Sequence, residues 1–242
     1  MAVVRESIAV PGRDRTHSPV PEGIKVGNLI FSSLLSASST EAMGDGGPDA
    51  DAELLFNRIQ GLVEAGGGTV EDIVDLSAYV IDDEDRKAIN KRWVIMFPDA
   101  ADRPSRHILN VAPKGIHGRF SVNFMAILPD APAQGEDVGR LVYSDLLVGR
   151  EPDTGEIPAD PDRQAEALFG QLKSWVEGAG GTIDNIVNLM MYDMGDEQRA
   201  VVNKQWAKMY PDRSNLPARQ TLNVLPSGLR EGLFAAVATA LV

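Results

Sequence analysis

The sequence predicts a chain of two tandem α+β domains, each a mixed β-sheet with two helices packed on one face. Three observations lead to this prediction: an internal repeat, a short linker between its two copies, and an alternation of strand-like and helix-like apolar patterns within each copy. At 242 residues, 43% of them hydrophobic, the chain is long enough for two domains that each bury a core.

The internal repeat covers most of the chain. Residues 52–128 align with residues 165–241 at a constant offset and without a gap. Both copies contain GGT, NK-x-W and PD, followed by P-x-R-x-x-LNV-x-P-x-G, and VGNLIFSS upstream matches VGRLVYSD. Between the copies, PDAPAQGED at 129–137 combines proline, glycine and acidic residues, which suits an exposed linker. The sequence therefore predicts two homologous domains.

The apolar pattern changes in the same order within each copy. VGNLIFSSLL and VGRLVYSDLL are short apolar runs typical of strands. Residues 52–65 place apolar side chains on one face of a helix, which the following glycines end. In the first copy we then expect a strand at 72–81, a helix at 84–97 and two closing strands that begin near Arg106 and Phe120. In the second copy we expect the strand at 185–194, the helix at 195–210 and the closing strands from near Arg219 and Leu233. The predicted order is ββ-α-β-α-ββ.

Composition excludes several classes of function. The absence of cysteine removes disulfides, thiolate catalysis and thiolate metal sites. His17, His107 and His117 lack metal-ligand spacing, and the acidic loops at 36–51 and 151–162 are interpreted as solvated loop and helix N-cap groups, so no metal is expected. The net charge of −12 disfavours nucleic acid and anionic membranes as partners. With no apolar run of about 18 residues and no secretory signal, we expect a cytoplasmic protein.

Two pairs of repeated residues in the second helix need separate interpretation. Trp93 and Trp206 lie on its apolar face and are predicted to belong to the core. Asn90 and Asn203 are interpreted as capping or helix–loop hydrogen-bonding residues, with a role in a pocket left open.

The second copy resembles the reactive intermediate deaminase family, RidA/YjgF, nearly from end to end. The resemblance rests on VGRLVYSD, DTGEIPAD, G-x-GGTIDNIV, N-K-x-W and PARQTLNVLP, of which the last is the most specific, and the first copy keeps PSRHILNVAP. It implies an N-terminal extension at 1–16 and RidA-like domains of chorismate-mutase type at 17–130 and 136–242. It also implies a homo-oligomer, a trimer of tandem chains, with ligand pockets between neighbouring domains.

The resemblance implies hydrolysis of an imine or enamine of a small carboxylate-bearing metabolite, of the 2-imino acid or 2-aminomuconate type, to a carbonyl compound and ammonia, without a cofactor. The family's signature arginine binds the substrate carboxylate, and Arg106 and Arg219 occupy its position. A guanidinium suits this role because it is permanently charged and donates two parallel hydrogen bonds to a carboxylate. The alternative for each arginine is an ion pair with an acidic neighbour.

The sequence departs from the family in the last strand. Family enzymes carry a glutamate there that positions the attacking water, and the ungapped alignment places Asn123 and Ala236 at this position. Neither side chain is a useful general base, although Asn123 is a candidate for holding a water. In the first strand of each copy, where the family binds ligand, the substrate-binding candidates are Ser32, Ser33 and Ser144. Asp145, in the same region, is the candidate catalytic carboxylate.

Two functional classes follow. The first is an imine or enamine deaminase, and the second is a non-catalytic small-carboxylate-binding protein, which the missing glutamate favours. RNA cleavage, sometimes attached to the family, is disfavoured by the net charge of −12 and by the lack of a basic-aromatic patch.

Overall fold

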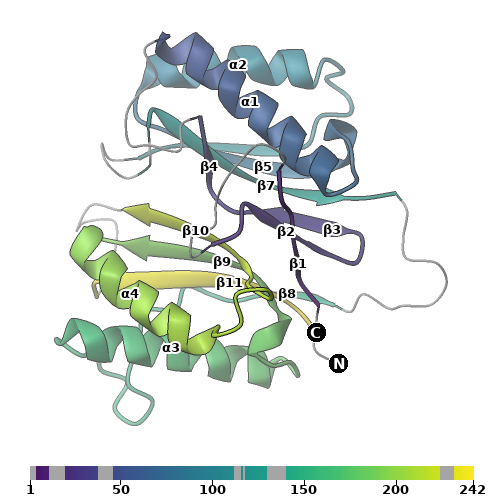
Figure 1. Cartoon of the computed structure of the whole chain (residues 1–242). Helices are drawn as coiled ribbons and strands as arrows, with labels where there is room; N and C mark the ends of the chain where they lie inside the picture. The colour runs from purple at the N-terminus through teal and green to yellow at the C-terminus, as the bar shows by residue number, and fades with distance from the viewer. Residues whose placement is uncertain are drawn as a thin grey trace. The chain divides into compact units, whose positions relative to one another are not determined.

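The computed structural model of the chain divides into two compact units (Figure 1). Ser7–Glu136 form the first, called the first domain below, and Met1–Glu6 with Asp137–Val242 form the second domain. The residues that the structure describes are 4–10, 20–37, 46–111, 116, 118–129, 140–223 and 232–242. Most of the predicted linker, His17 and His117 lie outside the described residues, as do residues 1–3 and 11–16 of the predicted N-terminal extension.

The first domain is a mixed sheet with two helices on one face, as predicted (Figure 1). Its strands run in the order β1-β2-β3-β7-β5-β6, with β4 also paired to β7; β5 and β6 are parallel and the pairs β2–β3, β3–β7 and β5–β7 are antiparallel. The elements are β1 Glu6–Ser7, β2 Gly23–Val26, β3 Leu29–Ser32, β4 Leu35–Ser36, α1 Gly47–Ala65, the short 3₁₀ helix η1 Val70–Asp72, β5 Ile73–Val80, α2 Asp83–Met96, β6 Ser105–Asn110 and β7 Phe120–Ile127.

The second domain repeats this arrangement with four strands in the order β10-β9-β11-β8. Its elements are β8 Leu141–Tyr143, α3 Pro161–Gly178, the 3₁₀ helix η2 Ile183–Asn185, β9 Ile186–Asp193, α4 Asp196–Met209, β10 Ala218–Asn223 and β11 Phe234–Leu241. Strands β9 and β10 are parallel, and β11 is antiparallel to both β9 and β8. Among the described residues, β8 is the first strand of this sheet along the chain, and it corresponds to β3; a counterpart of β2, and so of the β2–β3 hairpin, is not among them. The predicted opening pair of strands is therefore seen only in the first domain.

The helices pack as the apolar spacing predicts. Leu55, Ile59 and Leu62 of α1 recur on one face of the helix and are fully buried in the core of the first domain. Trp93 of α2 and Trp206 of α4 are buried in the cores of the first and second domains, which confirms the prediction made for both.

The register of the last strand corrects the ungapped alignment of the two copies. Phe120 pairs with Val80, whereas Phe234 pairs with Asp193, the counterpart of Val80 in the second copy. Phe120 therefore corresponds to Phe234, one residue further along than the constant offset predicts, so the second copy has one additional residue before β11.

It follows that Asn123 and Ala236 are not counterparts, as the alignment had them. Asn123 lies opposite Ser77, while Ala236 lies opposite Met191, and the residue that corresponds to Asn123 is Val237. The expectation that the strand lacks a base does not depend on this shift, because the sequences of β7 and β11, FSVNFMAI and FAAVATAL, contain no acidic residue.

The acidic residues before the first helix of each domain have two different roles. Asp160 is the N-cap of α3, where its side chain accepts a hydrogen bond from the backbone N–H of Arg163 at 3.1 Å, as predicted for this loop. Asp51, at the end of the corresponding loop, is instead buried within α1 with its carboxylate 3.3 Å from Nε of Arg119. The interpretation of Asp51 as a solvated residue was therefore wrong.

A glycine in the loop before α3 fixes the close approach of this loop to the helix. Gly149 has a φ of 73°, and a Cβ atom there would lie 2.5 Å from the backbone oxygen of Gln164. An alanine in the left-handed backbone conformation costs ~1–2 kcal/mol by itself. We expect Gly149→Ala to lower the free energy of unfolding by more than this, because the loop must also move away from the helix. Gly155→Ala is the matched control, since Gly155 has a φ of 70° and nothing within 4 Å of the added atom. Urea unfolding that gave equal losses for both variants would contradict this prediction.

Candidate functional site

The two signature arginines occupy equivalent places in the two sheets. Arg106 lies on β6 opposite Leu76, and Arg219 lies on β10 opposite Leu189. Residues that pair across a sheet share a face, and both leucines belong to the cores beneath the helices. Each arginine therefore leaves its strand on the helix-covered face, close to the second helix of its domain.

Each arginine stacks on the tryptophan of that helix. The guanidinium carbon of Arg106 lies 4.5 Å from the ring centroid of Trp93, and that of Arg219 lies 4.6 Å from the ring centroid of Trp206. A stacked guanidinium is held by its face, while its N–H donors point outward in its own plane. This orientation leaves the edge of the guanidinium as the part that can receive a carboxylate.

The repeated asparagine of the same helix contacts the arginine in the second domain. In the second domain, Nη2 of Arg219 donates a hydrogen bond to Oδ1 of Asn203 at 2.7 Å. In the first domain, Nη1 of Arg106 and Oδ1 of Asn90 are buried, and neither has a hydrogen-bond partner among the described residues. Asn203 therefore orients its arginine, and the first site retains a buried donor for a ligand.

The electrostatic surroundings of the two arginines differ. Burial, with a smaller contribution from Arg199, lowers the pKa of Arg219 to about 10, while Asp193 acts in the opposite direction. Burial is also the main cause that lowers the pKa of Arg106, followed by Arg103 and Arg86, and no acidic residue opposes them. A guanidinium with a pKa of about 10 is still charged at pH 7. Both sites are therefore cationic, and the acidic neighbour of the alternative interpretation acts only at Arg219.

A second arginine and an asparagine support each site. Arg86 of α2 donates a hydrogen bond to Oδ1 of Asn110, and Arg199 of α4 donates one to Oδ1 of Asn223. These contacts give the asparagine of the LNV motif the same hydrogen-bonding role in both copies.

The second domain adds a buried carboxylate that sequence reasoning missed. Asp193, at the end of β9, is fully buried with Oδ2 3.4 Å from Nε of Arg199. It stands where the first copy has Val80. Comparison of the two copies could have identified it, because an acidic residue that replaces an apolar one at the end of a buried strand indicates a nearby cation.

The predicted serines lie at the junction of the first and last strands. Oγ of Ser32 accepts a hydrogen bond from the backbone N–H of Phe124 at 2.8 Å, and Oγ of Ser144 accepts one from that of Ala238 at 2.9 Å. Ser33 is buried, and its backbone N–H donates to the carbonyl of Glu22 at 2.7 Å. These hydrogen bonds give Ser32 and Ser144 a structural role in the sheet, and their binding of substrate stays a prediction.

The two candidate catalytic residues lie in different surroundings. Asp145 is exposed, on the stretch between β8 and Leu147 and next to the exposed Leu146. Asn123 pairs with Ser77, which in turn pairs with His107, so its side chain lies on the face opposite to that of Arg106. Its Oδ1 is buried and has no hydrogen-bond partner among the described residues. Asn123 and Arg106 of one domain do not converge, and nothing in a single chain bears on the expected trimer, which stays a prediction.

The described part of the chain contains neither a cluster of metal-ligating residues nor a membrane-spanning helix. Within it, no group of three or more histidine, aspartate or glutamate residues is placed to hold a metal ion. None of the described helices is long and apolar enough to cross a membrane.

Comparison with known proteins agrees with the repeat. Residues 15–127 and 133–229 each match the family model described as Endoribonuclease L-PSP. The chain is 31% identical over 93 residues to a RutC family protein of Haemophilus influenzae, and 29% identical over 92 residues to the 2-iminobutanoate/2-iminopropanoate deaminase of Escherichia coli K12. Each match covers 38% of this chain and 72% of the relative.

Solved structures also resemble single domains of the chain. The YjgF gene product of Escherichia coli matches with 22% identity and a TM-score of 0.43, covering 50% of this chain and 98% of that one. A protein of unknown function from Pseudomonas aeruginosa matches with 20% identity and a TM-score of 0.47, covering 55% of this chain and 99% of that one.

Proposed function

The chain belongs to the RidA/YjgF family, of whose domain it carries two copies, and on this premise we propose that it is a deaminase of small imines or enamines that bear a carboxylate. Its relative in Escherichia coli is named for 2-iminobutanoate and 2-iminopropanoate, which belong to this chemical class. A 2-aminomuconate-type enamine is the larger substrate of the same class.

One observation carries the proposal: each domain holds a charged arginine that is stacked on a buried tryptophan of its second helix. In the second domain this arginine also donates a hydrogen bond to Asn203 of that helix. In the first domain Nη1 of Arg106 is buried without a hydrogen-bond partner among the described residues. A buried donor on a charged group is strongly stabilised by an anionic acceptor. A planar carboxylate matches the two parallel N–H groups of a guanidinium.

The chemistry needs little from the protein beyond positioning. Water adds to the carbon of the C=N bond, the π electrons move to nitrogen, and the nitrogen takes a proton. In the resulting carbinolamine the amino group takes a proton and the hydroxyl group gives one up, so that ammonia leaves as the C=O bond forms. Holding the carboxylate next to the arginine fixes the electrophilic carbon relative to a bound water, which is a substantial contribution to rate. Asp145 and Asn123 stay the predicted residues for proton transfer and for holding the water.

A second function, binding of a small carboxylate without turnover, is favoured by a different observation. Neither β7 nor β11 contains an acidic residue, so the strand that carries the family's glutamate has no general base in either copy. Ribonuclease activity, which the description of the matching family model names, is not part of the proposal, because a net charge of −12 repels a polyanion.

Turnover of an imino acid distinguishes the two functions. We expect the chain to accelerate pyruvate and ammonia formation from 2-iminopropanoate, generated in situ by an amino-acid oxidase, above the spontaneous rate. Saturable binding of pyruvate without acceleration would support the carboxylate-binding function instead. If neither acceleration nor binding of imino acids, 2-aminomuconate or their keto products is seen, both functions are excluded.

A further inference from the structure

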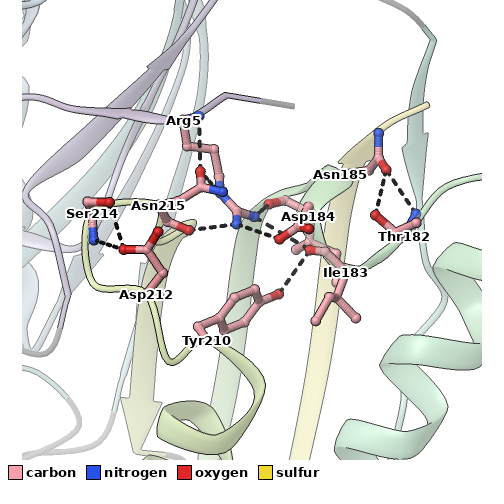
Figure 2. Close-up of polar contacts among 10 residues, drawn as sticks. Arg5, Thr182, Ile183, Asp184, Asn185, Tyr210, Asp212, Ser214 and Asn215 are labelled. Carbon is pink, nitrogen blue, oxygen red and sulfur yellow. Dashed lines mark hydrogen bonds and ion pairs between the residues drawn. The ribbon is translucent and has the colours of Figure 1, made fainter. Parts of the chain in front are cut away.

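The side chain of Arg5 is buried in the second domain, although it precedes the first domain in the sequence. Residues Met1–Glu6 belong to the same compact unit as Asp137–Val242. Arg5 is 2% exposed, which is rare for an arginine unless its charge and donors have partners. Figure 2 shows its guanidinium enclosed by Asn215, Asp184, Ile183 and Tyr210.

Three donor groups of the Arg5 side chain meet three different acceptors. Nε donates to Oδ1 of Asn215 at 3.0 Å, Nη2 donates to the backbone oxygen of Asn215 at 2.6 Å, and Nη1 donates to the backbone oxygen of Ile186 at 2.6 Å. The backbone N–H of Arg5 also donates to Oδ1 of Asn215, at 3.1 Å. The asparagine therefore holds both the main chain and the side chain of the arginine (Figure 2).

Charge and ring contacts complete the enclosure. The carboxylate of Asp184 lies 3.5 Å from Nη2 of Arg5, and the guanidinium carbon lies 5.3 Å from the ring centroid of Tyr210. The hydroxyl of Tyr210 is directed at the carbonyl of Ile183, at 3.5 Å. One anionic group, several carbonyl oxygens and an aromatic face together are the partners that a guanidinium prefers.

The positions of the acceptors favour a guanidinium over an ammonium ion. The acceptors of Nε, Nη1 and Nη2 are spread around a planar group with its donors at fixed positions. An ammonium ion concentrates its donors on one atom and cannot reach all three acceptors at once.

The first copy of the repeat lacks two residues of this site. Tyr210 and Asn215 correspond to Phe97 and Asp102. At the equivalent stretch of the first domain, Nε of Arg103 donates to the backbone oxygen of Phe97 at 2.8 Å, with Nη2 3.4 Å from that of Pro98. The enclosure around Arg5 is therefore a property of the second copy and not of the fold in general.

We propose that Tyr210, Asn215, Asp184 and the backbone oxygens of Ile183 and Ile186 form a guanidinium-binding site in the second domain, which Arg5 fills as an intramolecular ligand. The site is distinct from the carboxylate sites at Arg106 and Arg219, and the inference does not rest on the proposed deaminase activity. A small alkylguanidinium binds this site once the side chain of Arg5 is removed.

Chemical complementation of the full chain tests the proposal. Arg5→Ala removes the side chain beyond Cβ, and ethylguanidinium supplies those atoms. We expect ethylguanidinium chloride to raise the Tm of Arg5→Ala saturably and to bind this variant at least tenfold more tightly than the wild-type chain, as measured by calorimetry. Propylammonium chloride at the same ionic strength should not reproduce the effect.

Arg103→Ala is the matched control, because it removes an arginine bound to carbonyls at the equivalent stretch of the first domain. Ethylguanidinium should not raise its Tm. An equal shift for Arg5→Ala, Arg103→Ala and the wild type, or an equal effect of propylammonium, would overturn the proposal. If Arg5→Ala does not fold without a ligand, the test is its refolding yield in the presence of each additive. Ethylguanidinium should increase this yield, and a yield no higher than with propylammonium would overturn the proposal.

Discussion

Removing both signature arginines, in the variant Arg106→Ala/Arg219→Ala, should lower kcat/KM for 2-iminopropanoate by on the order of 10²- to 10⁴-fold. Each guanidinium can donate two charge-assisted hydrogen bonds to the substrate carboxylate, and such bonds contribute about 1.5–3 kcal/mol each. A loss of about 3–6 kcal/mol corresponds to this range, since about 1.4 kcal/mol is a factor of ten. The measurement is the rate of pyruvate formation over a range of substrate concentrations. Unchanged kcat/KM in the double variant would contradict the assignment of both arginines.

The single variants should show which domain is active, because each leaves one site intact. Arg106→Lys and Arg219→Lys keep a positive charge but lose the forked geometry, so they test whether charge alone suffices. Arg103→Ala is a suitable control, since it removes a neighbouring charge that lowers the pKa of Arg106 without occupying the signature position. Thermal unfolding of each variant separates lost binding from lost folding, which matters most for the buried Arg219.

The fold could be predicted because its determinants are local or repeated. The apolar face of α1 and the glycines that follow it are visible in a few turns of sequence, and the second copy repeats them in α3. The register of the last strand could not be obtained in this way, because an ungapped alignment conceals one inserted residue. Gly118 and Gly232, both with φ near 77°, and the phenylalanines that begin β7 and β11 identify the true correspondence.

The site was predictable only in part, for a related reason. Arg106 and Arg219 stand in a repeated motif, so their importance could be seen, but their stacking on Trp93 and Trp206 depends on how a helix packs against a strand. Arg5 offered no pattern at all. It is a single residue that contacts Asn215, 210 positions further along the chain, and no periodicity connects the two.

Breaking the ion pair between Glu22 and Arg58 from one side should strongly destabilise the first domain. Both side chains are buried, at 4% and 7% exposure, Arg58 donates a hydrogen bond to Glu22, and its Nη1 also donates to the backbone oxygen of Ser36 at 2.6 Å. We expect Glu22→Leu and Arg58→Met each to lower the free energy of unfolding by about 3–5 kcal/mol, because each removes one partner of a buried charged pair. Urea unfolding followed by circular dichroism measures the loss.

The double variant Glu22→Leu/Arg58→Met should lose much less than the sum of the single variants, because both charges of the pair are then removed together. The chain itself supports this expectation, since the second copy has the neutral Gln171 in place of Arg58. Lys91 and Asp49, whose charged atoms lie 2.6 Å apart but are more than half exposed, provide the control cycle in the same domain. Their coupling should be a small fraction of that between Glu22 and Arg58, because water and salt screen an exposed pair. Additive losses at Glu22 and Arg58 would show instead that the two side chains stabilise the domain through separate contacts, with Ser36 the main partner of the arginine.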